Sequence, residues 1–148
     1  MERLKTMLCV SIVAALIGAG LPSQVAVAGT SSDQETMADL TNRARERRDI
    51  RPLSLNRQLS DYAQRHSAQM ARRGRLFHTG NLARVLDGIN WSRAGENVGV
   101  GGSLPVVQDA FMNSPGHRAN ILDRRFDHVA TGVVHRGGRY WITVIFYG

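Results

Sequence analysis

The sequence predicts an α+β fold in which helices come first along the chain and a β-hairpin comes last. Residues 129–135 and 140–147 are rich in β-branched and aromatic residues, and Arg136-Gly137-Gly138-Arg139 separates them as a hairpin turn. The second run is apolar on both faces, whereas a strand of an antiparallel sheet normally leaves one face to water. We therefore expect a sandwich with further layers on both faces of the sheet.

Two helices are expected in the first part of the domain. Ser32 and Glu35 form a plausible capping box for a helix over residues 33–48. A second helix is expected to start after Asn56 and to end at Gly74. Its apolar face is expected to contain Leu59, Tyr62, Ala63, His66 and Met70. This position favours core packing for His66.

A long region rich in glycine and asparagine, residues 77–102, follows the second helix and holds most of the candidate polar chemistry. Ser103 is expected to cap a third helix with Pro105 in its first turn. A short fourth helix is expected from His117.

The N-terminus has the order of features of a secretory signal. Basic residues Arg3 and Lys5 precede an apolar run at residues 7–19, and Ala26-Val27-Ala28 supplies a small-x-small cleavage site. We expect residues 1–28 to be a signal peptide and residues 29–148 to be one exported domain, with an uncleaved anchor as the alternative. A stable transmembrane segment is not expected, because the run is shorter than the roughly 20 residues that span a bilayer. Cys9, the only cysteine, lies in this segment, so the domain is free of disulfides.

The formal charge of the chain is +7, and residues 29–148 carry +6 once Glu2, Arg3 and Lys5 are removed. This charge favours anionic surroundings such as cell-wall polymers or acidic lipids. No nucleic-acid-binding motif is present, so nucleic acid is not an expected partner.

His78, Glu96 and His117 are the residues best suited to carry chemistry. The histidines are 39 positions apart, so only the tertiary fold could bring them together. Two imidazoles and a carboxylate are reasonable Zn²⁺ ligands with a position left open for water. The spacing alone is a weak signal.

These residues lie in motifs that resemble the CAP superfamily (cysteine-rich secretory, antigen 5 and pathogenesis-related-1 proteins), in its bacterial secreted, SCP-like form. The resemblance covers residues 37–148. Its motifs are Asn42 with Arg45; Leu59, Ala63, His66 and Met70; Leu76-x-His78; Gly95-Glu96-Asn97; Phe111-x-x-Ser114-Pro115-Gly116-His117-Arg118-x-Asn120-Ile121-Leu122; Gly132-Val133; and Trp141-Ile142-Thr143-x-x-Phe146.

The resemblance implies a three-layer α-β-α sandwich with a central cleft, in which His78 and His117 hold a divalent metal such as Zn²⁺. Glu96 matches a third cleft position. Ser114 stands where the eukaryotic branch has a second glutamate, which removes an anionic ligand. Phe111 replaces the usual tryptophan. Family members that bind sterols and lipids make a small lipophilic ligand a further expectation.

Three functions remain open at this point. The favoured one is a secreted, non-enzymatic binding domain whose cleft of His78, Glu96, Ser114 and His117 holds a metal or a lipophilic ligand. The second is a metal-dependent hydrolase or peptidase with Glu96 as general base. The third is electrostatic adhesion to anionic cell-wall polymers through the arginines.

Two site residues have a structural alternative. Ser114 is expected to cap the short helix rather than act in catalysis. Glu96 could be a buried carboxylate that accepts backbone N–H groups. The ligand, the biological target and the oligomeric state are not predicted.

Overall fold

The computed structural model describes residues 28–148, with side chains from residue 32 onward. The predicted signal peptide therefore lies, apart from Ala28, outside the described residues. Within 28–148, no helix has the length and apolar character needed to cross a membrane.

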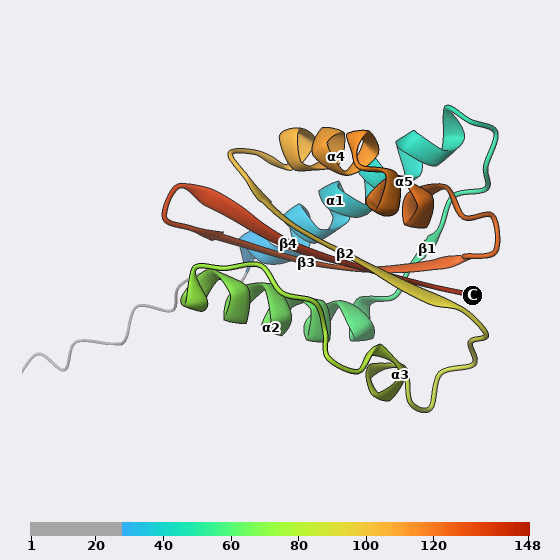
Figure 1. Cartoon of the computed structure of the whole chain (residues 1–148), viewed down its shortest axis with the longest axis horizontal. Coiled ribbons are helices and arrows are strands. Elements are labelled where there is room, and N and C mark those ends of the chain that lie inside the picture. Colours follow the sequence, from blue (N-terminus) through green and yellow to red (C-terminus); the bar gives the residue numbers. More distant parts are fainter. Residues whose placement is uncertain (1–27) are drawn as a thin grey trace, which may run out of the picture.

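A four-stranded sheet lies between two layers of helices, which confirms the predicted sandwich (Figure 1). The strand order is β1-β3-β4-β2, and their bounds are Ser54–Leu55 (β1), Ala94–Gly101 (β2), His128–Arg136 (β3) and Arg139–Tyr147 (β4). The short β1 pairs in parallel with β3, so the sheet is mixed rather than wholly antiparallel.

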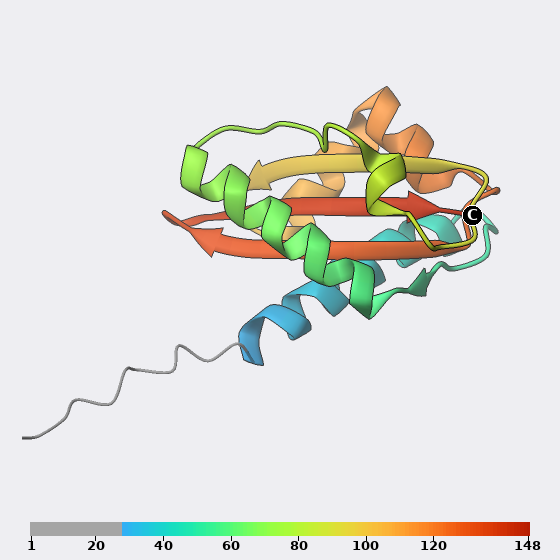
Figure 2. The same cartoon turned by 90° about the horizontal axis from the view of Figure 1, so that it is seen from below.

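The helices divide between the two faces of the sheet (Figures 1 and 2). One face carries α1 (Ala28–Glu46), α4 (Leu104–Asn113) and α5 (Pro115–Leu122), and the other carries α2 (Arg57–Arg73) and the short α3 (Leu82–Val85). Each face has its own apolar core between helices and sheet, with the larger one under α1, α4 and α5.

The C-terminal hairpin forms as predicted. Arg136 pairs with Arg139, and the two glycines between them have positive φ angles of 61° and 70°, the backbone that a two-residue hairpin turn of right-handed twist requires. Strand β4 lies between β3 and β2, and its residues from Trp141 to Tyr147 are buried. This explains why the run is apolar on both faces.

Helices α2 and α4 begin at the predicted caps. The Asn56 side chain accepts a hydrogen bond from the Leu59 N–H, and the Ser103 side chain accepts one from the Val106 N–H. Helix α1 differs from its prediction because it begins at Ala28. Ser32 and Glu35 lie inside it, so the capping box is wrong.

Strand β2 lies in the region that showed no regular pattern in the sequence. Its alternate residues Ala94, Glu96, Val98 and Val100 share one face, and Gly95, Asn97, Gly99 and Gly101 share the other. The first set faces α2 and the second faces α4 and α5. Because three of the four residues on the second face are glycines, that face lacks the β-branched and aromatic residues typical of a β-strand.

The fully buried Arg45 stabilises the end of the sandwich where α1 meets α5. Its guanidinium donates to four backbone carbonyls, and burial lowers its pKa. The acceptors and N···O distances are Arg51 (2.8 Å), Ile121 (2.8 Å), Asp123 (2.9 Å) and Phe126 (3.2 Å). Sequence analysis found Arg45 only as part of a motif and gave it no role.

Candidate functional site

The site lies around β2, which is one of the two edge strands of the sheet. Because side chains alternate along a strand, Glu96 points to the α2 face and Asn97 to the α5 face. His78 approaches this edge from the segment after α2, and His117 approaches it from the first turn of α5.

Glu96 holds His78 in a fixed orientation. Its Oε1 lies 2.8 Å from His78 Nδ1 and also accepts the Thr79 N–H at 3.0 Å. The Glu96 side chain is only 5 % exposed, whereas that of His78 is 60 % exposed. Since a carboxylate can only accept, Nδ1 of His78 carries the hydrogen, which leaves Nε2 as the nitrogen with a free lone pair.

His117 is oriented by Ser114. The Ser114 Oγ lies 2.9 Å from His117 Nδ1, and the rings of Phe111 and His117 are 5.0 Å apart. Ser114 occupies the N-cap position of α5, but its side chain makes no capping hydrogen bond. The predicted capping role of the Ser114 hydroxyl is therefore wrong.

The two histidines interact through space. Burial lowers the pKa of His117, and the nearby charge of His78 lowers it further. Glu96 joins His78, and Ser114 joins His117, but no hydrogen bond links one pair to the other among the described residues.

A buried amide network fixes α5 to β2. Asn97 donates to the His117 carbonyl at 3.0 Å. Asn120 donates to the Asn97 Oδ1 at 2.9 Å and to the Glu96 carbonyl at 3.3 Å. Both asparagines belong to the motifs of the sequence, but sequence analysis gave neither a role, and Thr79 was missed altogether. The network positions His117 relative to Glu96.

The donor set suits an open, weakly held divalent cation. Both Nδ1 atoms are engaged, so the Nε2 atoms of His78 and His117 are the nitrogens available as ligands. Glu96 already accepts at both oxygens, with the Thr79 N–H 3.4 Å from Oε2, and Ser114 is uncharged. Over residues 28–148 no group of three or more His, Cys, Asp or Glu side chains gathers for a metal. The two imidazoles could supply at most part of a ligand set, which water or a bound molecule would have to complete.

His66 is a core residue, as predicted. It is 4 % exposed, and its Nδ1 lies 3.1 Å from the Thr143 hydroxyl. Burial lowers its pKa, against the raising effect of Glu96 and with a lesser lowering effect of His78. Burial therefore disfavours the protonated form of His66 inside the fold.

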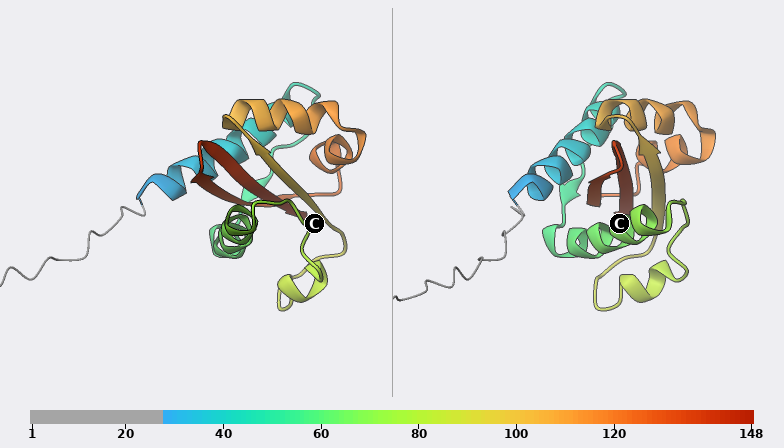
Figure 3. Two further views of the ribbon diagram at one scale, coloured as in Figure 1. Left: turned by 60° about the vertical axis from the view of Figure 1, so that its left-hand side comes forward. Right: turned by 90° about the vertical axis from the view of Figure 1, so that its left-hand side faces the viewer.

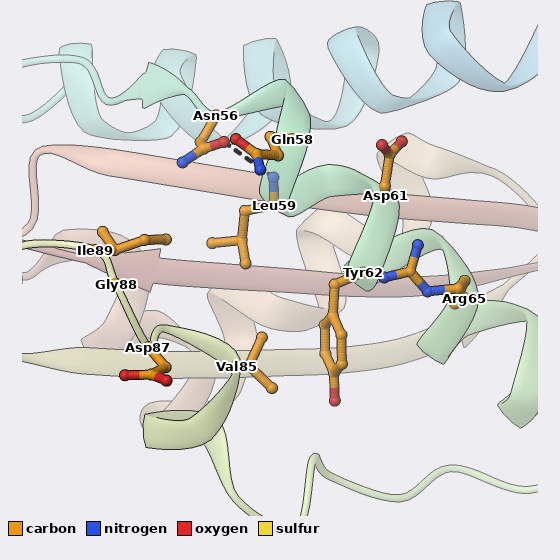
Figure 4. A pocket seen from close by; sticks show the side chains of 10 residues that line it. All are labelled: Asn56, Gln58, Leu59, Asp61, Tyr62, Arg65, Val85, Asp87, Gly88 and Ile89. Carbon is orange, nitrogen blue, oxygen red and sulfur yellow. Dashed lines mark hydrogen bonds between the residues drawn. The ribbon is translucent and has the colours of Figure 1, made fainter.

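A separate hollow of about 470 Å³ lies between α2 and the segment 85–89 (Figure 4). Leu59, Tyr62, Val85 and Ile89 form its apolar part, and Asp61, Arg65 and Asp87 lie around it. None of the four predicted cleft residues lines this hollow. Its mixed lining suits an amphiphilic molecule better than a wholly apolar one.

Comparison with known proteins gives consistent matches. The profile of the family described as "CAP: Cysteine-rich secretory protein family" matches residues 38–147. A Bacillus subtilis relative, "Uncharacterized protein YkwD", is 33 % identical over 119 residues, which cover 76 % of this chain and 46 % of the relative.

Solved structures show the same fold. An extracellular protein containing a SCP domain from Bacillus anthracis matches with a TM-score of 0.70 and 28 % identity, covering 80 % of this chain and 41 % of that one. A cysteine-rich secretory protein from Staphylococcus aureus matches with a TM-score of 0.65 and 25 % identity, covering 82 % and 40 %. This chain spans less than half the length of these relatives.

Proposed function

This chain belongs to the CAP (cysteine-rich secretory protein) family, and on that premise we propose that it is an extracellular binding domain. The site formed by His78, Glu96, Ser114 and His117 at the edge of β2 binds a divalent cation, or a ligand carried by one, through Nε2 of His78 and His117. The contact of Glu96 with His78, matched by that of Ser114 with His117, is the observation that carries the proposal. The extracellular location is supported by the relatives described as extracellular or secretory and by the signal-like N-terminus.

The residues of the cleft have distinct tasks in this proposal. Glu96 holds the His78 ring and fixes its tautomer, whereas Ser114 holds the orientation of the His117 ring. Asn97 and Asn120 hold the backbone of α5 against β2. A bound cation would supply a positive centre with open positions for an anionic or carbonyl group of the ligand.

The same geometry argues against Glu96 as the general base of a hydrolase. A base must take a proton from water, but the Glu96 carboxylate is nearly buried and already accepts from His78 and Thr79. Binding is therefore the function that this arrangement supports best.

Calorimetric titration of Zn²⁺ into the metal-stripped exported protein tests the proposal. We expect one saturable site in the parent and none in the His78→Ala/His117→Ala variant. Glu96→Gln should weaken binding by about 10- to 100-fold, the usual effect of removing a group that orients a ligand. His135→Ala removes an exposed histidine outside the cleft and should leave the titration unchanged. No saturable binding by the parent, or equal binding by the double variant, would overturn the metal site.

A small amphiphilic ligand is a second candidate, and the hollow beside α2 favours it. Ile89→Asp places a charge against the apolar part of the hollow and should abolish binding of a fluorescent fatty acid without changing the zinc titration. His78→Ala should lose the zinc binding and leave the binding of the fatty acid unchanged. Equal fatty-acid binding by Ile89→Asp and the parent would exclude the hollow as the site.

A further inference from the structure

Three segments without any acidic residue meet at one end of the sheet: residues 71–77, 100–106 and 134–140. Val134, Trp141 and Val100 form one rung across β3, β4 and β2, and Phe77 packs against them. The hairpin turn follows immediately, and the right-hand view of Figure 3 shows this end of the molecule facing the viewer, with α2 on one side and α4 on the other.

Five exposed arginines gather on these segments, and we call this region the arginine end. They are Arg72, Arg73, Arg75, Arg136 and Arg139. None forms an ion pair with another described residue, although Arg57, Arg93 and Arg125 do so elsewhere. An uncompensated cluster of this kind favours an anionic partner.

The side chains converge on the α2 side of the sheet. The guanidinium carbons of Arg73 and Arg75 lie 4.9 and 5.4 Å from the Phe77 ring centre, so one ring holds both groups. Arg136 and Arg139 are two residues from Val134 and Trp141, which pack on that same side. Because strand side chains alternate, all four guanidinium groups belong to one side of this end.

Exposed apolar residues lie at the same end. Leu76 is 42 % exposed and Val106 is 57 % exposed, and they are the two exposed large hydrophobic residues of the described chain. Leu76 lies between Arg75 and Phe77 in the sequence. Val106 lies beside Gly101, where β2 ends, on the α4 side of this end, whereas the four guanidinium groups lie on the α2 side.

We infer that the arginine end docks on the surface of an anionic phospholipid bilayer. The planar guanidinium group has paired donors that match phosphate oxygens, and Leu76 and Val106 can enter the headgroup region. A soluble polyanion would use the arginines but gain little from the two apolar side chains. The inference does not depend on the cleft.

Vesicle co-sedimentation of the exported protein tests this inference. We expect binding to vesicles of equal parts phosphatidylglycerol and phosphatidylcholine, little binding to phosphatidylcholine alone, and loss of binding with added salt. Arg136→Gln/Arg139→Gln should weaken binding roughly 25-fold, about fivefold for each arginine at an anionic surface. The matched variant Arg51→Gln/Arg84→Gln removes two exposed arginines from elsewhere and should bind within about twofold of the parent.

Leu76→Ser/Val106→Ser separates a bilayer from a soluble polymer. It should weaken vesicle binding severalfold but leave binding to soluble polyphosphate unchanged. Circular dichroism and the thermal midpoint establish that each variant is folded. The inference is wrong if the parent does not bind anionic vesicles, or if Arg51→Gln/Arg84→Gln loses as much binding as Arg136→Gln/Arg139→Gln. It is also wrong if Leu76→Ser/Val106→Ser binds vesicles as well as the parent.

Discussion

Substitution of Gly95 by alanine tests whether the amide network holds α5 against β2. A Cβ atom at Gly95 would lie 2.7 Å from the Asn120 Oδ1 and 3.0 Å from its Cγ, so the Asn120 side chain must move. Asn120 would then lose its bonds to the Glu96 carbonyl and to Asn97. The substitution thus reaches the site without touching His78 or His117.

The expected loss of unfolding free energy follows from these contacts. Two hydrogen bonds contribute about 1 kcal/mol each, and the Oδ1 of the fully buried Asn97 loses a donor, which adds about 1 kcal/mol. The total is about 3 kcal/mol, which for a domain of this size lowers the thermal midpoint by roughly 12 °C.

Thermal and urea unfolding of Gly95→Ala and Gly102→Ala measure this effect. Gly102 is exposed, and a Cβ atom added there would have nothing within 4 Å, so its substitution should change stability by less than about 0.5 kcal/mol. In an Asn120→Ala background, Gly95→Ala should cost little, because the group that it displaces is gone. Equal stability of the two glycine variants would refute the reasoning.

Three further substitutions test the core and the charges. Arg45→Met should cost about 3–5 kcal/mol in urea unfolding, because buried carbonyls lose their donor. Asp123 accepts hydrogen bonds from Arg125 and Arg93, which hold its pKa well below the usual range. The free energy of unfolding should therefore fall as the pH drops below about 4, and Asp123→Asn should make that fall smaller. Burial lowers the pKa of His66, so the unfolded chain binds its proton more readily, and stability should be complete above about pH 6.5 and decrease below it. His66→Phe should make that decrease smaller, as read from midpoints at about pH 7.5 and 5.5. The part due to His117, whose pKa is also lowered, should remain.

Local signals in the sequence were sufficient for the hairpin and for two helices. The Gly137-Gly138 turn, the Asn56 cap and the Ser103 cap act through their immediate neighbours, so a short window contains the whole cause. Strand β2 has no such signal, because it is held by backbone pairing to β4. Its glycines leave space in which the side chains of Phe111 and Val107 pack against the strand. A strict alternation with glycine or asparagine at every second position was the available clue.

The candidate site shows a similar division. Residue types identified His78, Glu96, Ser114 and His117, but not which of them would be joined. Ser114 was expected to cap a helix, and instead its hydroxyl bonds to the His117 ring. Whether a hydroxyl meets a backbone N–H or a side chain depends on the rotamer within the folded turn, which local sequence does not determine.

Strand β2 connects the two helical layers through adjacent residues. Glu96 binds the segment after α2, and Asn97 binds α5 on the opposite face. A ligand held by both histidines would therefore join the two layers at the edge of the sheet, beyond its last strand. Because such a ligand binds only the folded chain, it stabilises the domain by about 2.7 kcal/mol at 100 times its dissociation constant. Zinc should accordingly raise the thermal midpoint of the parent, and loss of either His78 or His117 should remove the whole increase, since each layer supplies only one ligand.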